Sequence, residues 1–184
     1  MEYSTLDIEG LVLFKPRKFQ DNRGFFTETF RQNIFDEAVG GEQVFVQDNH
    51  SFSEKRGTVR GLHYQAPPHA QGKLVRCAAG KILDVAVDVR RNSPHFGRHI
   101  SVELSSENGH QLWVPAGFLH GFITLSDACH VAYKVTDYYD HASEHNVLWS
   151  DNELAINWGE FETSPIVSDK DKVAPSFSNW VSPF

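Results

Sequence analysis

The chain has 184 residues with 40% hydrophobic and 22% charged content, which is ordinary for a globular protein with one hydrophobic core. A formal net charge of −7 excludes a generally basic surface for nucleic acid or anionic lipid. Two cysteines, Cys77 and Cys129, exclude a disulfide framework and a cysteine zinc motif, and both are expected to be buried thiols. The sequence shows no signal peptide and no apolar run of membrane-spanning length, so it predicts a cytoplasmic location.

The first part of the chain predicts short strands. Residues 6–14 alternate loosely and predict a strand, which Pro16 ends because proline cannot donate to a ladder. Asp21-Asn22-Arg23-Gly24 is a turn by residue type, and it precedes a predicted strand over residues 25–30.

One good helical stretch follows, over residues 33–39. Asn33 is expected to cap this helix, and Gly40-Gly41 to stop it. A further strand is predicted over residues 43–50, followed by a polar loop over 51–58.

The middle of the chain is rich in strand patterns. Residues 81–89 alternate strictly, which places Val85 and Val87 on one face and Asp84 on the other. Glu107-Asn108-Gly109 predicts a hairpin turn. Further strands are predicted over residues 60–65, 73–76, 100–104, 111–114, 118–125 and 130–136.

The last forty or so residues are less regular and are expected to wrap the strands as short helical or turn pieces. Frequent short strands with one helix predict an all-β sandwich or barrel. Without repeats or linkers, a single domain over residues 1–184 is the simplest interpretation.

The stretch from Arg60 to Arg76 carries most of the candidate chemistry. His63 lies between Arg60 and Lys73, and histidine is the side chain best suited to take and return protons near neutral pH. Cations beside a base favour a substrate that carries phosphate or develops an oxyanion. The alternative is a structural histidine, which is the commoner role of a lone histidine in a strand. Arg23 could join Arg60 on a diphosphate, or be a scattered surface arginine.

Other polar residues could complete such a site. His120 could converge on His63 inside a barrel, or serve the structure alone. Tyr133 is expected to point inward and is a general-acid candidate only if His63 lies opposite; most inward tyrosines are core residues. The run Ser168-Asp169-Lys170-Asp171 offers a carboxylate to orient the base, although a solvated turn is the alternative.

A metal-dependent cupin barrel would need an H-x-H pair followed by a Glu and a later His. The residue two positions after His63 is Gln65, and the remaining histidines show no such spacing. The sequence therefore predicts a barrel without a catalytic metal.

The sequence resembles the dTDP-4-dehydrorhamnose 3,5-epimerase family, the cupin-type nucleotide-sugar epimerases, over nearly the whole chain. The resemblance rests on D-N-R-G-F-F-T-E-T-F (21–30), V-F-V-Q-D-N-H-S (44–51), V-R-G-L-H-Y-Q (59–65), Q-G-K-L-V-R-C (71–77), L-D-V-A-V-D-V-R (83–90), S-P-H-F-G (93–97), Q-L-W-V-P-A-G-F-L-H-G-F (111–122), Y-K-V-T-D-Y-Y (133–139) and S-D-K-D (168–171). It implies a cupin-like jelly-roll β-barrel, usually dimeric, with an N-terminal strand that crosses to the partner.

The resemblance also implies roles for individual residues. His63 looks like the base, Asp171 its orienting partner with Asp169 as the other candidate, Tyr133 the acid, and Lys73 the residue that steadies the enolate oxygen. Arg23 and Arg60 resemble diphosphate contacts. The other implied substrate-contacting residues are Phe26, Glu28, Gln47, Asn49, His120, Tyr138, Glu144 and Lys170.

The favoured hypothesis is a metal-free and cofactor-free isomerase of a dTDP-4-keto-6-deoxyhexose, inverting C3 and C5 by proton transfer next to the 4-keto group. A mono-epimerase that inverts only C3 or only C5 would share the same residues. A non-catalytic cupin that binds a sugar or nucleotide is a third hypothesis, and a metal-dependent cupin is a fourth that Gln65 disfavours.

Overall fold

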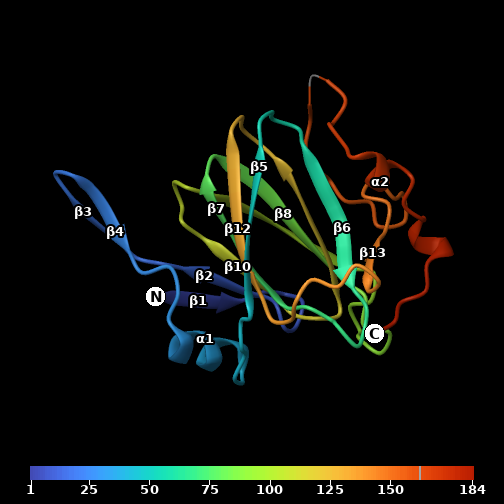
Figure 1. Ribbon diagram of the computed structural model, residues 1–184, viewed down its shortest axis with the longest axis horizontal. Helices are drawn as coiled ribbons and strands as arrows, with labels where there is room; N and C mark the ends of the chain where they lie inside the picture. The colour runs from blue at the N-terminus through green and yellow to red at the C-terminus, as the bar shows by residue number, and fades with distance from the viewer. Residues whose placement is uncertain (162) are drawn as a thin grey trace.

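The structure is a computed structural model that describes residues 1–161 and 163–184. Two antiparallel sheets face each other to form the body of the molecule, and a separate two-stranded hairpin projects from it (Figure 1). The six-stranded sheet has the order β1-β2-β10-β7-β12-β5, and the five-stranded sheet has the order β13-β6-β11-β8-β9. This cupin-like jelly roll confirms the predicted fold class.

The elements have the following bounds. The six-stranded sheet contains β1 (Glu2–Thr5), β2 (Val12–Lys15), β10 (Gln111–Val114), β7 (Lys73–Ala79), β12 (Cys129–Val135) and β5 (Gln47–Ser53). The five-stranded sheet contains β13 (Glu144–Asn146), β6 (Val59–Gln65), β11 (Phe118–Thr124), β8 (Lys81–Asp88) and β9 (His99–Ser105). The remaining elements are the hairpin β3 (Lys18–Asp21) and β4 (Gly24–Thr27), the helices α1 (Gln32–Val39) and α2 (Asp169–Lys172), and the 3-10 turn η1 (Phe177–Asn179).

Strand β8 shows how the layers are built. Its residues Ile82 and Ala86 enter the core between the two sheets, whereas Val85 and Val87 pack on the other face against the C-terminal segment. Both faces of this strand are therefore buried, and burial of apolar surface is the main favourable term in folding. The strict alternation predicted over residues 81–89 is confirmed.

The C-terminal segment covers the outer face of the five-stranded sheet, and it ends beside the barrel (Figure 1). The indole nitrogen of Trp180 donates to the hydroxyl of Tyr64 at 2.8 Å. The Arg91 guanidinium also donates at 2.7 Å to the carbonyl of Ser182. These contacts fix the segment that carries α2 against strand β6.

Two local predictions near the N-terminus are wrong. Residues 6–14 do not form one strand, because a turn containing Gly10 at φ 98° separates β1 from β2. Helix α1 is confirmed, with Gly40 ending it at φ 77°, but Arg31 and not Asn33 is its N-cap residue.

Three further strand assignments also need correction. The strand predicted over 43–50 begins at Gln47 and continues to Ser53, so it takes in part of the expected loop. The expected strand over 25–30 ends at Thr27, where it pairs with β3, a strand that was not predicted. Strand β13 lies in the segment that was expected to be irregular.

Both cysteines are buried free thiols, as predicted. Within residues 1–161 and 163–184, none of the helices combines the length and apolar character that crossing a membrane requires.

Candidate active site

A close approach of two strands brings two histidines together. Strands β6 and β11 pair His63 with His120, and the register shifts immediately afterwards. Gly61 adopts φ 133°, and a Cβ atom built on it would lie 2.5 Å from the Cα of Gly121. Only glycine fits this conformation and this contact, so the R-G-L-H and L-H-G-F motifs serve to place two imidazoles side by side.

A buried carboxylate holds the ring of His63. The Nε2 atom of His63 lies 2.6 Å from Oδ1 of Asp171, whose side chain is only 3% exposed. Burial would raise the pKa of Asp171, but hydrogen bonds and charge from His63, with help from Ser168 and Asn146, hold that pKa below its usual value. With Nε2 engaged, Nδ1 is the ring nitrogen left to act on a ligand.

Asp169, the other candidate partner, points away from His63. Its side chain is 99% exposed and pairs with Lys172 at 2.9 Å. The geometry therefore identifies Asp171 as the carboxylate that contacts His63. Ser168 caps α2 and helps to hold Asp171 in place, because the Ser168 hydroxyl accepts a hydrogen bond from the backbone N–H of Asp171.

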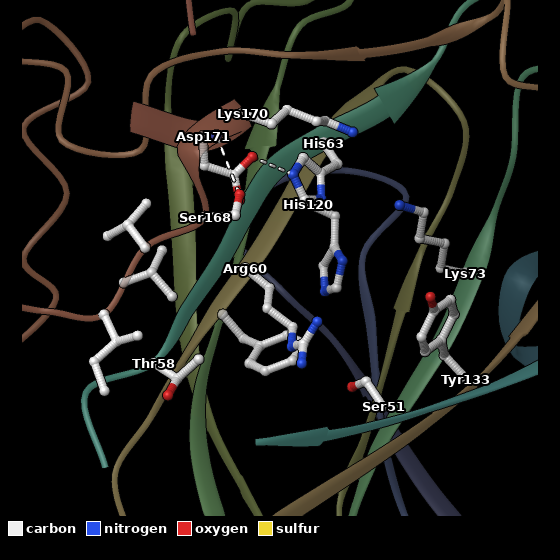
Figure 2. A pocket seen from close by; sticks show the side chains of 14 residues that line it. Ser51, Thr58, Arg60, His63, Lys73, His120, Tyr133, Ser168, Lys170 and Asp171 are labelled. Atoms are coloured by element: carbon white, nitrogen blue, oxygen red, sulfur yellow. Dashed lines mark hydrogen bonds and ion pairs between the residues drawn. The ribbon is translucent and has the colours of Figure 1, made fainter. Parts of the chain in front are cut away.

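Lys73 and Tyr133 stand together on the wall formed by β7 and β12, across from the tail residues (Figure 2). Burial lowers the pKa of Lys73 to about 8, although the carboxylates of Asp84 and Glu144 oppose this effect. Burial also raises the pKa of Tyr133, against an opposing influence from the Arg60 guanidinium. The tyrosine is therefore kept protonated and able to donate, while the lysine is a buried ammonium at neutral pH.

One cavity of about 470 Å³ between the sheets gathers half of the predicted site residues. Its walls include the predicted site residues Arg60, His63, Lys73, His120, Tyr133, Lys170 and Asp171. Arg60 is held there by donating to the carbonyl of Phe52 at 2.9 Å and to the hydroxyl of Ser53 at 3.2 Å. The cavity thus combines two imidazoles, three cationic side chains and a phenol.

An adjoining hollow contains three more predicted residues, Gln47, Asn49 and Glu144, beside His63, Lys73 and Tyr133. Glu144 pairs with Lys170 at 2.7 Å. Although burial would raise the pKa of Glu144, this lysine holds it below its usual value. Gln47 and Asn49 are linked to each other by a hydrogen bond of 2.8 Å.

Four predicted residues do not line the cavity of their own chain. Arg23, Phe26 and Glu28 lie on or next to the projecting hairpin, where Arg23 pairs with Asp21 and Phe26 is 71% exposed. Tyr138 is 64% exposed, and its backbone carbonyl accepts a hydrogen bond from the Gln65 side chain.

Two further polar residues lie near the site, and the sequence predicted no role for the first of them, Asp84. Asp84 is fully buried and accepts or shares a proton with Nε2 of His120 at 2.8 Å. The alternation of β8 already places this carboxylate on the core-facing side of the strand, so the sequence contained a signal that Asp84 is buried. Gln65 stands where a metal-binding H-x-H motif would have its second histidine. Its side-chain amide donates hydrogen bonds to the carbonyls of His69 and Tyr138. Within residues 1–161 and 163–184, no group of three or more His, Cys, Asp and Glu side chains could hold a metal ion.

The fold and the cavity define a class of protein. A carboxylate-oriented imidazole, a protonated phenol and a buried ammonium around one cavity are suited to move protons on a substrate that develops negative charge on oxygen. This combination, inside a cupin-like jelly roll, is the arrangement of a proton-transfer isomerase.

Comparison with known proteins identifies the family. Residues 5–179 match the model of the dTDP-4-dehydrorhamnose 3,5-epimerase family. The dTDP-4-dehydrorhamnose 3,5-epimerase of Shigella flexneri is 52% identical over 171 residues, covering 93% of each chain. This chain belongs to the dTDP-4-dehydrorhamnose 3,5-epimerase family.

Two solved structures show the same architecture. The dTDP-6-deoxy-D-glucose-3,5-epimerase of Legionella pneumophila, in complex with dTDP-4-keto-L-rhamnose, is 43% identical with a TM-score of 0.91 over 96% of this chain and 93% of that one. A 3′-monoepimerase of Streptomyces bikiniensis, in complex with dTDP-quinovose, is 36% identical with a TM-score of 0.89 over 95% of this chain and 87% of that one.

Proposed function

We propose that this chain epimerises dTDP-4-dehydro-6-deoxy-D-glucose at C3 and C5 and so produces dTDP-4-dehydro-L-rhamnose. The observation that carries the proposal is the His63–Asp171 pair, 2.6 Å apart, in one cavity with Tyr133 and Lys73. The relatives named 3,5-epimerases at up to 52% identity support the same reaction.

The proposed reaction is a pair of proton transfers next to the C4 carbonyl. That carbonyl acidifies the hydrogens on C3 and C5, and Nδ1 of His63 removes one of them as a proton. The electron pair moves into the C4 oxygen as an enolate, which the Lys73 ammonium stabilises. Tyr133 then returns a proton to the opposite face of the carbon, which inverts that centre.

Asp171 has two consequences for the base. It holds the imidazole with Nε2–H toward the carboxylate, so that Nδ1 faces the cavity. It also stabilises the imidazolium that forms when His63 takes up the proton. Because Asp171 is buried, its charge acts in a medium of low effective dielectric, so its attraction for the imidazolium is stronger than it would be in water.

We further propose that the active form is a homodimer. Arg60 would contact the diphosphate from within the cavity, and Arg23 from the hairpin of the partner chain. The exposed hairpin with Phe26 and the nearby Glu28 favours this arrangement, because these residues lie away from the cavity of their own chain. Tyr138 would face the nucleotide base, while Gln47, Asn49, His120, Glu144 and Lys170 would contact the substrate around the cavity.

Proton NMR in deuterium oxide tests the reaction. The protein is incubated with the 4-keto sugar nucleotide without added metal or cofactor, and deuterium is followed at C3 and C5. We expect both positions to exchange, and a His63→Ala variant to lose the exchange by a factor of at least about 10³. Absence of exchange at both carbons with the wild-type chain would contradict the enzymatic function and favour a non-catalytic binding protein.

A mono-epimerase is the second candidate function, and the similarity to the 3′-monoepimerase of Streptomyces bikiniensis favours it. The same experiment separates the two, because a mono-epimerase would incorporate deuterium at one carbon only.

Three other expectations stay predictions: that the reaction needs no metal or nicotinamide, that residues 1–184 fold as a single domain, and that the protein is cytoplasmic. Elemental analysis of the active protein checks the first of them. Iron at one atom per chain would revive the metal-dependent cupin.

A further inference from the structure

Asp84 is a buried charged residue that the proposed mechanism does not use. It lies on β8 with no exposed surface, on the face that points between the two sheets. Its Oδ1 atom lies 2.8 Å from Nε2 of His120, which is itself only 8% exposed. Its Oδ2 atom is buried and has no hydrogen-bond partner among the described residues. A carboxylate in this position is costly unless nearby positive charge compensates it.

A cation faces the same cavity as His120. Burial lowers the pKa of Lys73, and the carboxylates of Asp84 and Glu144 both oppose this effect. The other charged groups at the cavity already have partners: Asp171 is paired with His63, and Glu144 with Lys170. Arg60 is hydrogen-bonded to Phe52 and Ser53. Among the carboxylates of the described residues around the cavity, Asp84 is therefore distinguished by its contact with His120.

His120 repeats the geometry of His63. In each histidine Nε2 contacts a buried carboxylate, at 2.6 Å for His63 and 2.8 Å for His120. Cross-strand pairing places the two rings next to each other at the same cavity. In His120, the contact with Asp84 leaves Nδ1 as the nitrogen available to the sugar.

We propose that Asp84 is a positioning residue of the epimerase site, which fixes the ring orientation and the tautomer of His120. This inference rests on the proposed function for its catalytic consequence. It differs from a purely structural role because it ties the tautomer of a cavity-lining histidine to one carboxylate.

The Asp84→Asn variant tests the positioning of His120 through kcat and the tautomer of the ring. An amide can donate to Nε2 as well as accept from it, so the share of His120 with its proton on Nδ1 should rise, which nitrogen-15 NMR measures. At pH 7.5 we expect kcat to fall about 10- to 100-fold, the range found when a partner that orients a metal-ligating histidine is lost. Asp84→Glu, which keeps the charge, should keep the proton on Nε2.

Asp88→Asn is the matched control. Asp88 lies on the same strand and the same face, is equally buried, and bonds Arg90 and Ser93 instead of the cavity residues. This variant should lose stability without changing the tautomer of His120. An unchanged tautomer in Asp84→Asn, or the same change of tautomer in Asp88→Asn, would overturn the proposal.

Nitrogen-15 NMR of the wild-type protein without substrate gives a readout that needs neither turnover nor a stable variant. We expect His120 to carry its proton on Nε2, with the resonance assigned by its loss in His120→Gln. A proton on Nδ1 alone would overturn the proposal. If the expected tautomer is seen but no deuterium exchange occurs with the sugar nucleotide, the proposed function fails while the positioning of His120 by Asp84 stands.

Discussion

The cavity between the sheets and the projecting β3–β4 hairpin differ in how the chain supports their polar residues. In the cavity, His63 and His120 each contact a buried carboxylate, and burial alters the pKa of Lys73 and Tyr133. On the hairpin, Arg23 pairs at the surface with its neighbour Asp21, and 85% of its side chain is exposed. If the proposed function holds, the chain builds the proton-transfer part of the site by itself and presents the hairpin residues to another molecule.

The composition of the hairpin supports the same distinction. Phe19, Phe25 and Phe26 are each more than half exposed on a two-stranded ribbon, although such ribbons are marginally stable alone. Lys18 ties the base of the hairpin to the carbonyls of Ser106 and Glu107. Exposed aromatic residues on a ribbon held only at its base are suited to contact another molecule. We expect the cavity and the hairpin to act separately within one chain and together in a dimer.

The largest effect is expected from Asp171→Asn in the cavity. The amide cannot stabilise the imidazolium and can favour the wrong tautomer of His63, so kcat should fall by roughly 10²- to 10⁴-fold. The pKa of Asp171 is depressed in the folded protein, so its carboxylate stabilises the fold at neutral pH, and this contribution is lost as the pH falls through the folded-state pKa. The variant should therefore also unfold more easily than the wild type at pH 7, measured by urea denaturation.

Asp169→Asn is the control, two residues away in the same short helix. Its carboxylate is exposed and pairs with Lys172. We expect kcat within about twofold of the wild type, since exposed ion pairs contribute little. Similar losses of kcat in both variants would show that the helix as a whole, and not the Asp171 carboxylate, supports His63.

The fold was largely predictable because its strands alternate clearly. The period of two over residues 81–89 predicted β8 correctly. The hairpin predicted at the Asn-Gly turn of residues 108–109 is wrong, because this turn joins strands of different sheets: β9 pairs with β8, whereas β10 pairs with β2 and β7. The errors fall where local signals compete: Gly10 interrupts an apolar run with a turn, and β5 starts at Gln47 because pairing with β12 overrides the apolar preference of residues 44–46. Tertiary pairing decided these boundaries, and a single sequence does not contain it.

The site was less predictable from the sequence than the fold. The resemblance supplied the identities of His63, Lys73 and Tyr133, but spacing alone could not bring Asp171 to His63, because the tail reaches β6 only through packing on the outer sheet face. Asp84 was visible as a charge on a core-facing position, yet its partner His120 comes from a strand 36 residues away. Long-range partners of this kind need the assembled fold.

A smaller effect is expected from pH acting on Lys73. Because burial lowers its pKa to about 8, the ammonium is present below that pH and is lost above it. The lysine must be charged to stabilise the enolate, so kcat/KM should fall about fivefold between pH 8 and pH 9 and about tenfold per pH unit above that, as the protonated fraction falls. Lys73→Arg keeps its charge in this range, so this variant, though slower, should retain its rate above pH 8.

Lys134→Met is the control for the pH profile. Lys134 is the residue next to Tyr133 on β12, but it pairs with Asp48 at 2.9 Å at the surface. Its loss should leave the alkaline limb in place. If kcat/KM of the Lys73→Arg variant still falls above pH 8, the ionisation responsible belongs to another group.

The smallest effect is expected from Arg23→Ala on the hairpin. An exposed arginine that contacts only one end of the substrate should raise KM by about five- to tenfold and leave kcat nearly unchanged. Steady-state kinetics with the 4-keto sugar nucleotide measures both constants. A loss in kcat with KM unchanged would place Arg23 in the chemical step instead of in binding.

Mixing variants then shows whether the hairpin serves the partner's cavity. When Arg23→Ala and His63→Ala chains exchange subunits, each mixed dimer regains one site with both residues intact if Arg23 acts across the dimer, so activity at low substrate should exceed the sum of the two variants. His63→Ala mixed with Asp171→Asn is the control, because these two residues belong to one cavity and every mixed site lacks one of them. Recovery in the first mixture alone supports a shared site. Activity equal to the sum in both mixtures would mean that Arg23 does not act on the partner, and the hairpin would then need another explanation for its exposed aromatic residues.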